Sequence, residues 1–78
     1  MIVRHVAPTY QDEIILVERQ GASGKWQALR YAPESIGLDF ARTQSCGCYR
    51  ATIDRRGIRR VELFRIINSP HNRQIIFG

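Results

Sequence analysis

Apolar residues recur along the whole chain in short runs, separated by glycine, proline and polar residues. Six runs are rich in β-branched or aromatic side chains, and such runs predict β-strands. They are residues 1–7, 14–20, 25–31, 46–53, 58–67 and 74–77. The pattern therefore predicts a single domain, residues 1–78, of about five to six short strands.

The turn GASG joins the second and third runs and predicts a β-hairpin with a four-residue loop. Pairing Gln20 with Lys25 across this loop brings apolar residues opposite one another on one face of the hairpin. The same register sets Arg19 opposite Trp26, where we expect a cation–π contact.

A second hairpin is expected around a single glycine, in the sequence ATIDRRGIRRVEL. A three-residue loop at residues 55–57 sets Asp54 opposite Ile58. It places Gly57 in the left-handed conformation that such loops require. Gly57 is therefore interpreted as a turn residue.

The register of this second hairpin decides which side chains share a face of the sheet. We expect Tyr49 opposite Leu63 on one face and Arg50 opposite Glu62 on the other. A shift that sets Tyr49 opposite Glu62 pairs an aromatic ring with a carboxylate and is less favourable.

Residues 33–43 are less regular. Pro33 suits the first turn of a helix, and Ile36 and Phe40 have the spacing of one helical face, whereas Gly37 weakens a helix. We expect one short helix at residues 33–43. The whole pattern predicts a mainly β or α+β fold, a small curved antiparallel sheet or partial barrel built from two hairpins.

Charge is distributed unevenly along the chain. Residues 1–45 contain five basic and five acidic residues, whereas residues 46–78 contain seven arginines and two acids and so carry the whole net charge of +5. A basic half beside a neutral half suggests an anionic partner. A preference for arginine codons explains eleven arginines against one lysine, but it does not explain their clustering.

Four arginines surround Gly57: Arg55, Arg56, Arg59 and Arg60, here termed the arginine cluster. Guanidinium groups match phosphate oxygens and stay charged, so the cluster suggests contact with nucleic acid or another polyanion. The predicted nucleic-acid-binding residues are Arg55, Arg56, Arg59, Arg60, Arg65 and Arg73. Arg50 is a weaker candidate because Glu62 is expected to pair with it. The alternative is a solvated hairpin tip, since no signature motif for RNA or DNA binding is present.

Cys46 and Cys48 are two positions apart on a predicted strand and point the same way. Together with His5 and His71 they have the ligand count of a tetrahedral zinc site. The Cys-x-Cys spacing is not the usual knuckle, and each histidine is isolated, so half-buried reduced thiols are the alternative. We expect no metal and no cofactor.

The histidines also allow a small nuclease, in which His5 and His71 would meet and perform acid–base chemistry. No spacing motif supports this hypothesis. The chain has no nucleophile elbow, phosphate loop or carboxylate pair. We therefore expect a binding protein rather than an enzyme.

The segment YRATIDRRGIRRVELFRI, residues 49–66, resembles the final hairpin of RelE/ParE-type bacterial toxins. In those toxins a Tyr-Arg strand, a turn and a valine-rich strand close the sheet. They place two helices ahead of the sheet, whereas residues 1–45 here predict a β-hairpin. We therefore assign neither the family nor any residue role from this resemblance.

Two functions from different classes follow. The first is a small binding protein that contacts nucleic acid through its basic C-terminal hairpin. The second is a homo-oligomeric assembly module of phage or mobile-element type, in which an apolar edge strand such as residues 74–77 pairs with a partner. No apolar run approaches the ~18 residues of a membrane span and no signal-peptide stretch is present, so we expect a cytoplasmic protein without a membrane partner.

Overall fold

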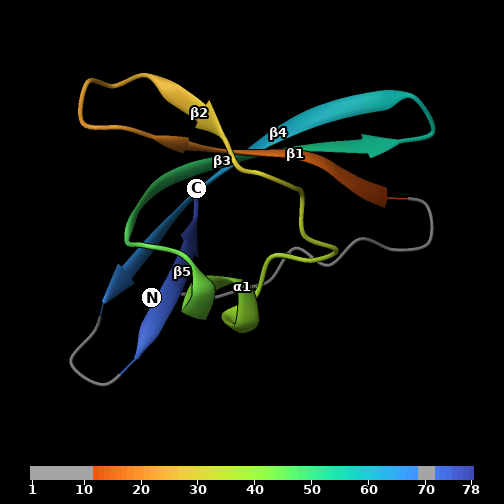
Figure 1. Ribbon diagram of the computed structural model, residues 1–78. Helices are drawn as coiled ribbons and strands as arrows, with labels where there is room; N and C mark the ends of the chain where they lie inside the picture. Colours follow the sequence, from red (N-terminus) through yellow and green to blue (C-terminus); the bar gives the residue numbers. More distant parts are fainter. Residues whose placement is uncertain (1–11, 69–71) are drawn as a thin grey trace.

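The structure is a computed structural model that describes residues 12–68 and 72–78. In this part of the chain, five strands form one antiparallel sheet in the order β2-β1-β3-β4-β5, with one short helix on one side of it (Figure 1). The elements are β1 (Asp12–Gln20), β2 (Trp26–Ala28), α1 (Leu38–Thr43), β3 (Gly47–Arg55), β4 (Ile58–Asn68) and β5 (Arg73–Phe77).

The predicted fold class is confirmed as a small curved antiparallel sheet, and this sheet does not close into a barrel. One source of curvature is a β-bulge in β1 between Ile14 and Leu16, which lets Ile14 and Val17 both face the core. The two hairpins turn at opposite ends of the sheet (Figure 1). The predicted strand at residues 1–7 lies outside the described residues.

The predicted helix at residues 33–43 is only partly correct, because α1 begins at Leu38. Gly37 precedes it with an extended backbone, at φ −151° and ψ −160°. Ile36 and Phe40 are nevertheless both buried, so the apolar pair identified in the sequence does face the core. The predicted strand at residues 25–31 is also shorter, since β2 has three residues.

The predicted register of the first hairpin is wrong by one residue. Gln20 lies opposite Trp26, and Arg19 lies opposite Gln27. Lys25 belongs to the loop, where its carbonyl oxygen accepts a hydrogen bond of 2.8 Å from the Gly21 amide. The loop is therefore one residue longer than expected.

The register of the second hairpin is also wrong by one residue. Arg55 lies opposite Ile58, so the loop has two residues, Arg56 and Gly57. Both have a left-handed backbone, at φ +52° and +85°, as a type I′ turn requires. Asp54 fixes this turn, because its Oδ1 accepts a hydrogen bond of 3.0 Å from the Gly57 amide.

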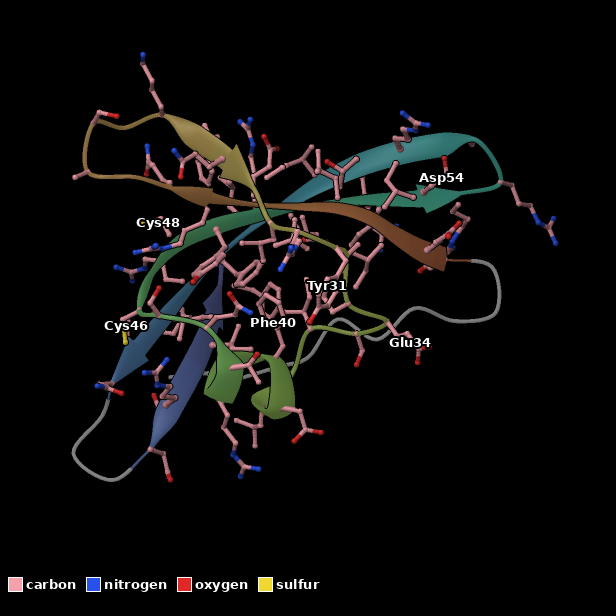
Figure 2. All side chains as sticks on the ribbon, viewed as in Figure 1. Tyr31, Glu34, Phe40, Cys46, Cys48 and Asp54 are labelled. Atoms are coloured by element: carbon pink, nitrogen blue, oxygen red, sulfur yellow. The ribbon has the colours of Figure 1, made fainter. Side chains whose placement is uncertain are left out.

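As a result, Tyr49 lies opposite Phe64 rather than Leu63. The Tyr49 and Phe64 rings stack at 5.3 Å. Phe40 of α1, labelled in Figure 2, packs edge-on against both. The Tyr49 hydroxyl donates a hydrogen bond of 2.6 Å to the Ser45 carbonyl. In the part of the chain that the structure describes, the buried hydrophobic residues are Ile14, Val17, Ile36, Phe40, Ala41, Tyr49, Ala51, Ile53, Phe64, Ile66 and Ile75.

The opposite face of the sheet, here termed the outer face, is the one directed away from α1. A one-residue slip in register moves every side chain of a strand to the other face. Val61 and Leu63 of β4 therefore lie on the outer face, where they are 58% and 51% exposed. No helix among the described residues is long and apolar enough to cross a membrane.

Candidate functional site

The arginine cluster lies at the β3–β4 turn, as predicted, but carboxylates already occupy most of it. Arg55 makes a bidentate contact with Asp12 of β1, in which Nε meets Oδ1 and the second nitrogen is 3.0 Å from Oδ2. A nitrogen of Arg60 lies 3.6 Å from the same carboxylate, and Arg60 Nε lies 3.6 Å from Glu62 Oε1. These contacts form one network on the α1 side of the sheet.

The contacts of this network shift the pKa values of Asp12 and Arg55. The hydrogen bond from Arg55 lowers the pKa of Asp12 below its usual value, and the nearby charges of Arg55 and Arg60 lower it further. The same hydrogen bond raises the pKa of Arg55. Asp12 and Arg55 are therefore held in their charged forms by each other.

Arg59 lies on the outer face, where its Nε is 3.3 Å from Asp54 Oδ2. Three of the four arginines in the cluster are thus paired with carboxylates. Glu13 lies opposite Asp54 at the same end of the sheet. The four carboxylates at this end are Asp12, Glu13, Asp54 and Glu62. They balance the four arginines, so the cluster is not a strongly positive surface.

Arg56 differs from the other members of the cluster. It is exposed at the tip of the turn and makes no ion pair or hydrogen bond with a described residue. It also has φ +52°, a conformation that residues other than glycine and asparagine rarely adopt. It is the cluster member available to a ligand.

The remaining predicted arginines serve different purposes. Arg65 is exposed on the outer face between Cys48 and Ile76, with no ion pair among the described residues. Arg73 instead donates a hydrogen bond of 3.3 Å to the Ala41 carbonyl and so ties β5 to α1. The structure therefore does not gather the predicted residues into one basic surface.

Arg50 has a partner, but the predicted partner is wrong. It binds Glu18 of β1 through two hydrogen bonds, of 2.7 and 3.1 Å, rather than Glu62 of β4. Its guanidinium also lies 4.4 Å from the ring centre of Trp26, the cation–π contact that had been expected of Arg19. Arg50 therefore already occupies one face of the indole.

Arg50 and Glu18 also shift each other's pKa values. The hydrogen bond from Arg50 lowers the pKa of Glu18, and the same bond raises the pKa of Arg50. Since β1 supplies Glu18 as well as Asp12, acids from the first half of the chain neutralise arginines from the second half.

Cys46, just before β3, and Cys48, its second residue, are free thiols at the end of the sheet away from Asp54 (Figure 2). Both are exposed, so the expectation of half-buried cysteines is wrong. His5 and His71 lie outside the described residues, as does any contact between them. Within residues 12–68 and 72–78, no three histidine, cysteine or acidic side chains gather into a metal-binding group.

A shallow hollow of about 660 Å³ lies beside α1, and Asp39 is part of its lining. The lining also includes Tyr31, Glu34 and Phe40, which are labelled in Figure 2. Among the described residues that line it there is no cysteine or histidine. Thr43 also lines the hollow, and its hydroxyl donates a hydrogen bond of 2.9 Å to the Phe40 carbonyl.

The edge of β4 is the feature that the sequence analysis missed. β5 pairs with β4 only from Phe64 onward, and the Gly78 amide closes the pairing with a 3.2 Å hydrogen bond to the Leu63 carbonyl. Residues 58–63, here termed the free edge of β4, pair with β3 but with no described strand on their other side. Ile58, Val61 and Leu63 of this segment are 76%, 58% and 51% exposed.

Comparisons with known proteins find no matching family model, no matching curated protein and no matching solved structure.

Proposed function

We propose that this protein is a non-enzymatic interaction module that binds a β-strand of another polypeptide at the free edge of β4. The observation that carries the proposal is the free edge itself. An edge strand presents unpaired amide and carbonyl groups, and strand addition is a common way to satisfy them.

The backbone of the free edge is oriented for strand addition. In an antiparallel strand the amide and carbonyl of successive residues point alternately to either side. The Leu63 carbonyl points away from β3, since it accepts the hydrogen bond of Gly78. By this alternation the backbone groups of Arg59 and Val61 point away from β3 as well.

The side chains of the free edge support the same function. Three of the five large hydrophobic residues that are exposed in the described chain are Ile58, Val61 and Leu63. Single exposed apolar residues are common on proteins, but three on one unpaired edge mark a surface that another chain can cover.

Photo-crosslinking in the producing cells tests this proposal. Benzoylphenylalanine in place of Val61 should give a crosslinked species, whether the partner is another protein or a second copy. The matched control carries it in place of Arg42, whose side chain is 72% exposed on α1. Equal crosslinking at the two positions, or none at position 61, contradicts the proposal.

Contact with nucleic acid is a second candidate function, supported by Arg56 and Arg65. Both are exposed and make no ion pair with a described residue, and Arg56 keeps a costly left-handed backbone where asparagine would be more stable. Two free guanidinium groups supply phosphate contacts without sequence specificity.

Fluorescence anisotropy of labelled single-stranded RNA, single-stranded DNA and duplex DNA, at several salt concentrations, tests this candidate. Arg56→Ala with Arg65→Ala should weaken binding and reduce the slope of log affinity on log salt by about one for each lost phosphate contact. Arg42→Ala is the matched control. Absence of binding to all three probes at low salt removes this function.

A further inference from the structure

We infer that the surface for nucleic acid lies at the end of the sheet opposite the arginine cluster, and that its ligand is a single strand. Its cations are Arg19, Lys25 and Arg65, here termed the basic end, and Trp26 lies beside them. This is the end at which Cys48 is labelled in Figure 2. The inference rests on the second candidate function, contact with nucleic acid, and names its surface and the form of its ligand.

Acidic residues are absent from the segments that form this end of the sheet. Residues 19–28, 45–50 and 63–68 of strands β1 to β4 and their connections contain four cations and no aspartate or glutamate. Of these cations, only Arg50 has a carboxylate partner among the described residues, Glu18. At the other end, four carboxylates balance the arginine cluster. The unbalanced positive charge of these four strands therefore lies at the basic end.

The three cations of the basic end are exposed, and none of their side chains makes an ion pair or a hydrogen bond with a described residue. Arg19 and Arg65 both border Gly47, the first residue of β3. Arg19 Nε lies 3.7 Å from the place that a β-carbon of Gly47 would occupy, and Arg65 lines an open hollow together with Gly47. Lys25 lies in the neighbouring loop between β1 and β2. Their charges therefore reinforce one another at one end of the molecule.

A hollow on the outer face adds an aromatic wall to this end. It has a volume of about 210 Å³ and is lined by Trp26, Cys48, Leu63 and Arg65 among others. Arg50 lies 4.4 Å from the centre of the Trp26 ring but does not line the hollow, so the indole still borders it. The indole and Leu63 offer apolar contact to a flat base, and Arg65 offers a charge-assisted hydrogen bond to the adjoining phosphate.

The hollow favours a single strand over a duplex. In a duplex the bases are paired and stacked inside the helix, whereas the bases of a single strand are free to contact an aromatic side chain. Phosphate contacts alone carry no such preference, because both forms present phosphates. Contact between a base and Trp26 therefore supplies the selectivity for a single strand.

Alanine substitutions test the location of the surface. Arg19→Ala, Lys25→Ala and Arg65→Ala combined should weaken the binding of labelled oligothymidylate about tenfold or more in fluorescence anisotropy. The slope of log affinity on log salt should fall in magnitude by about two, as three lost phosphate contacts give for a single strand. All three side chains are exposed, so the fold should be retained.

The matched control removes three positive charges elsewhere on the surface, by Arg42→Ala, Arg56→Ala and Arg59→Ala combined. These residues lie on α1 and at the β3–β4 end of the sheet. The control should keep most of the affinity of the wild type and most of its salt slope. A control that loses as much affinity as the basic-end variant overturns the inference.

The fluorescence of Trp26, the only tryptophan of the chain, tests the contact with a base without a substitution. Oligothymidylate should quench this emission, whereas inorganic polyphosphate, which has the charge but no base, should leave it unchanged. A duplex of oligothymidylate with oligoadenylate should bind about tenfold or more weakly than the single strand at the same salt concentration. Equal quenching by polyphosphate, or a duplex that binds as tightly, overturns the single-strand contact.

The candidate function and this inference fail in different ways. Absence of oligothymidylate binding by the wild type at low salt removes contact with nucleic acid altogether. Binding that the control substitutions weaken more than the basic-end substitutions keeps that function, moves it to another surface and overturns the inference.

Discussion

Tyr49 lies directly opposite Phe64 across the β3–β4 pair, with the two rings stacked 5.3 Å apart and only 10° from parallel. This contact fixes which side of β4 faces the core. With Phe64 turned inward, its neighbours Leu63 and Val61 face outward on the same strand. The exposure of Val61 and Leu63 at the free edge is thus a consequence of how the core is packed.

Truncation of Phe64 should destabilise the fold far more than truncation of its neighbour Leu63. Phe64→Ala removes a buried ring and is expected to cost about 3–5 kcal/mol of unfolding free energy, whereas Leu63→Ala is expected to cost less than about 1 kcal/mol. Urea denaturation of dilute protein, where association does not contribute, measures both values. A larger cost for Leu63→Ala would support the register that sets Leu63 opposite Tyr49.

Asparagine at position 56 should stabilise the β3–β4 turn. Arg56 has φ +52°, and asparagine tolerates this conformation better, so Arg56→Asn should stabilise the fold by about 0.5–1 kcal/mol. Gly57→Ala, at φ +85°, should destabilise it by about 1 kcal/mol or more. The denaturation midpoints of the two variants measure both changes in stability. A loss of stability in Arg56→Asn contradicts the turn assignment.

The strands could be predicted because β-branched and aromatic runs alternate with short turns. Four of the six predicted runs correspond closely to β1, β3, β4 and β5. The register of the second hairpin could not, because the left-handed conformation is expected at Gly57 but not at an arginine. Arg56 adopts it too, which removes one residue from the loop and moves every side chain of β4 to the other face.

The pairing of the arginine cluster with carboxylates could not be predicted from the net charge of each half of the chain. Asp12 and Arg55 are 43 positions apart, and only the β1–β3 pairing brings them together. The free edge left a weak signal in the sequence, since a ten-residue run at 58–67 was followed by a run of only four residues at 74–77. A shorter neighbour leaves part of a long strand unpaired.

Acidification should weaken the fold through Asp12. Its pKa is lowered in the folded state, so its contribution to stability is complete above about pH 5 and is lost as the pH falls below the ordinary value of 3.8 and through the lower folded pKa. Asp12→Asn should melt at a lower temperature than the wild type at neutral pH, and the difference should vanish near about pH 2. Asp39→Asn, at the exposed Asp39–Arg42 pair, should follow the wild type at every pH.

The Arg50–Trp26 contact should be visible in the fluorescence of the only tryptophan. Arg50→Ala removes the guanidinium from the indole ring and exposes the ring to water, so the emission of Trp26 should shift to longer wavelength. Arg19→Ala should leave the emission unchanged, because Arg19 lies opposite Gln27. A shift in Arg19→Ala and none in Arg50→Ala would instead support the register predicted from the sequence, in which Arg19 lies opposite Trp26.

Amide hydrogen exchange in dilute protein tests the free edge of β4 most directly. The amides of Arg59 and Val61 point away from β3, so they should exchange rapidly. The amides of Arg60, Glu62 and Phe64 point toward β3 and should be protected. Exchange at Arg59 and Val61 that is as slow as at Arg60 and Glu62 would contradict a free edge on β4.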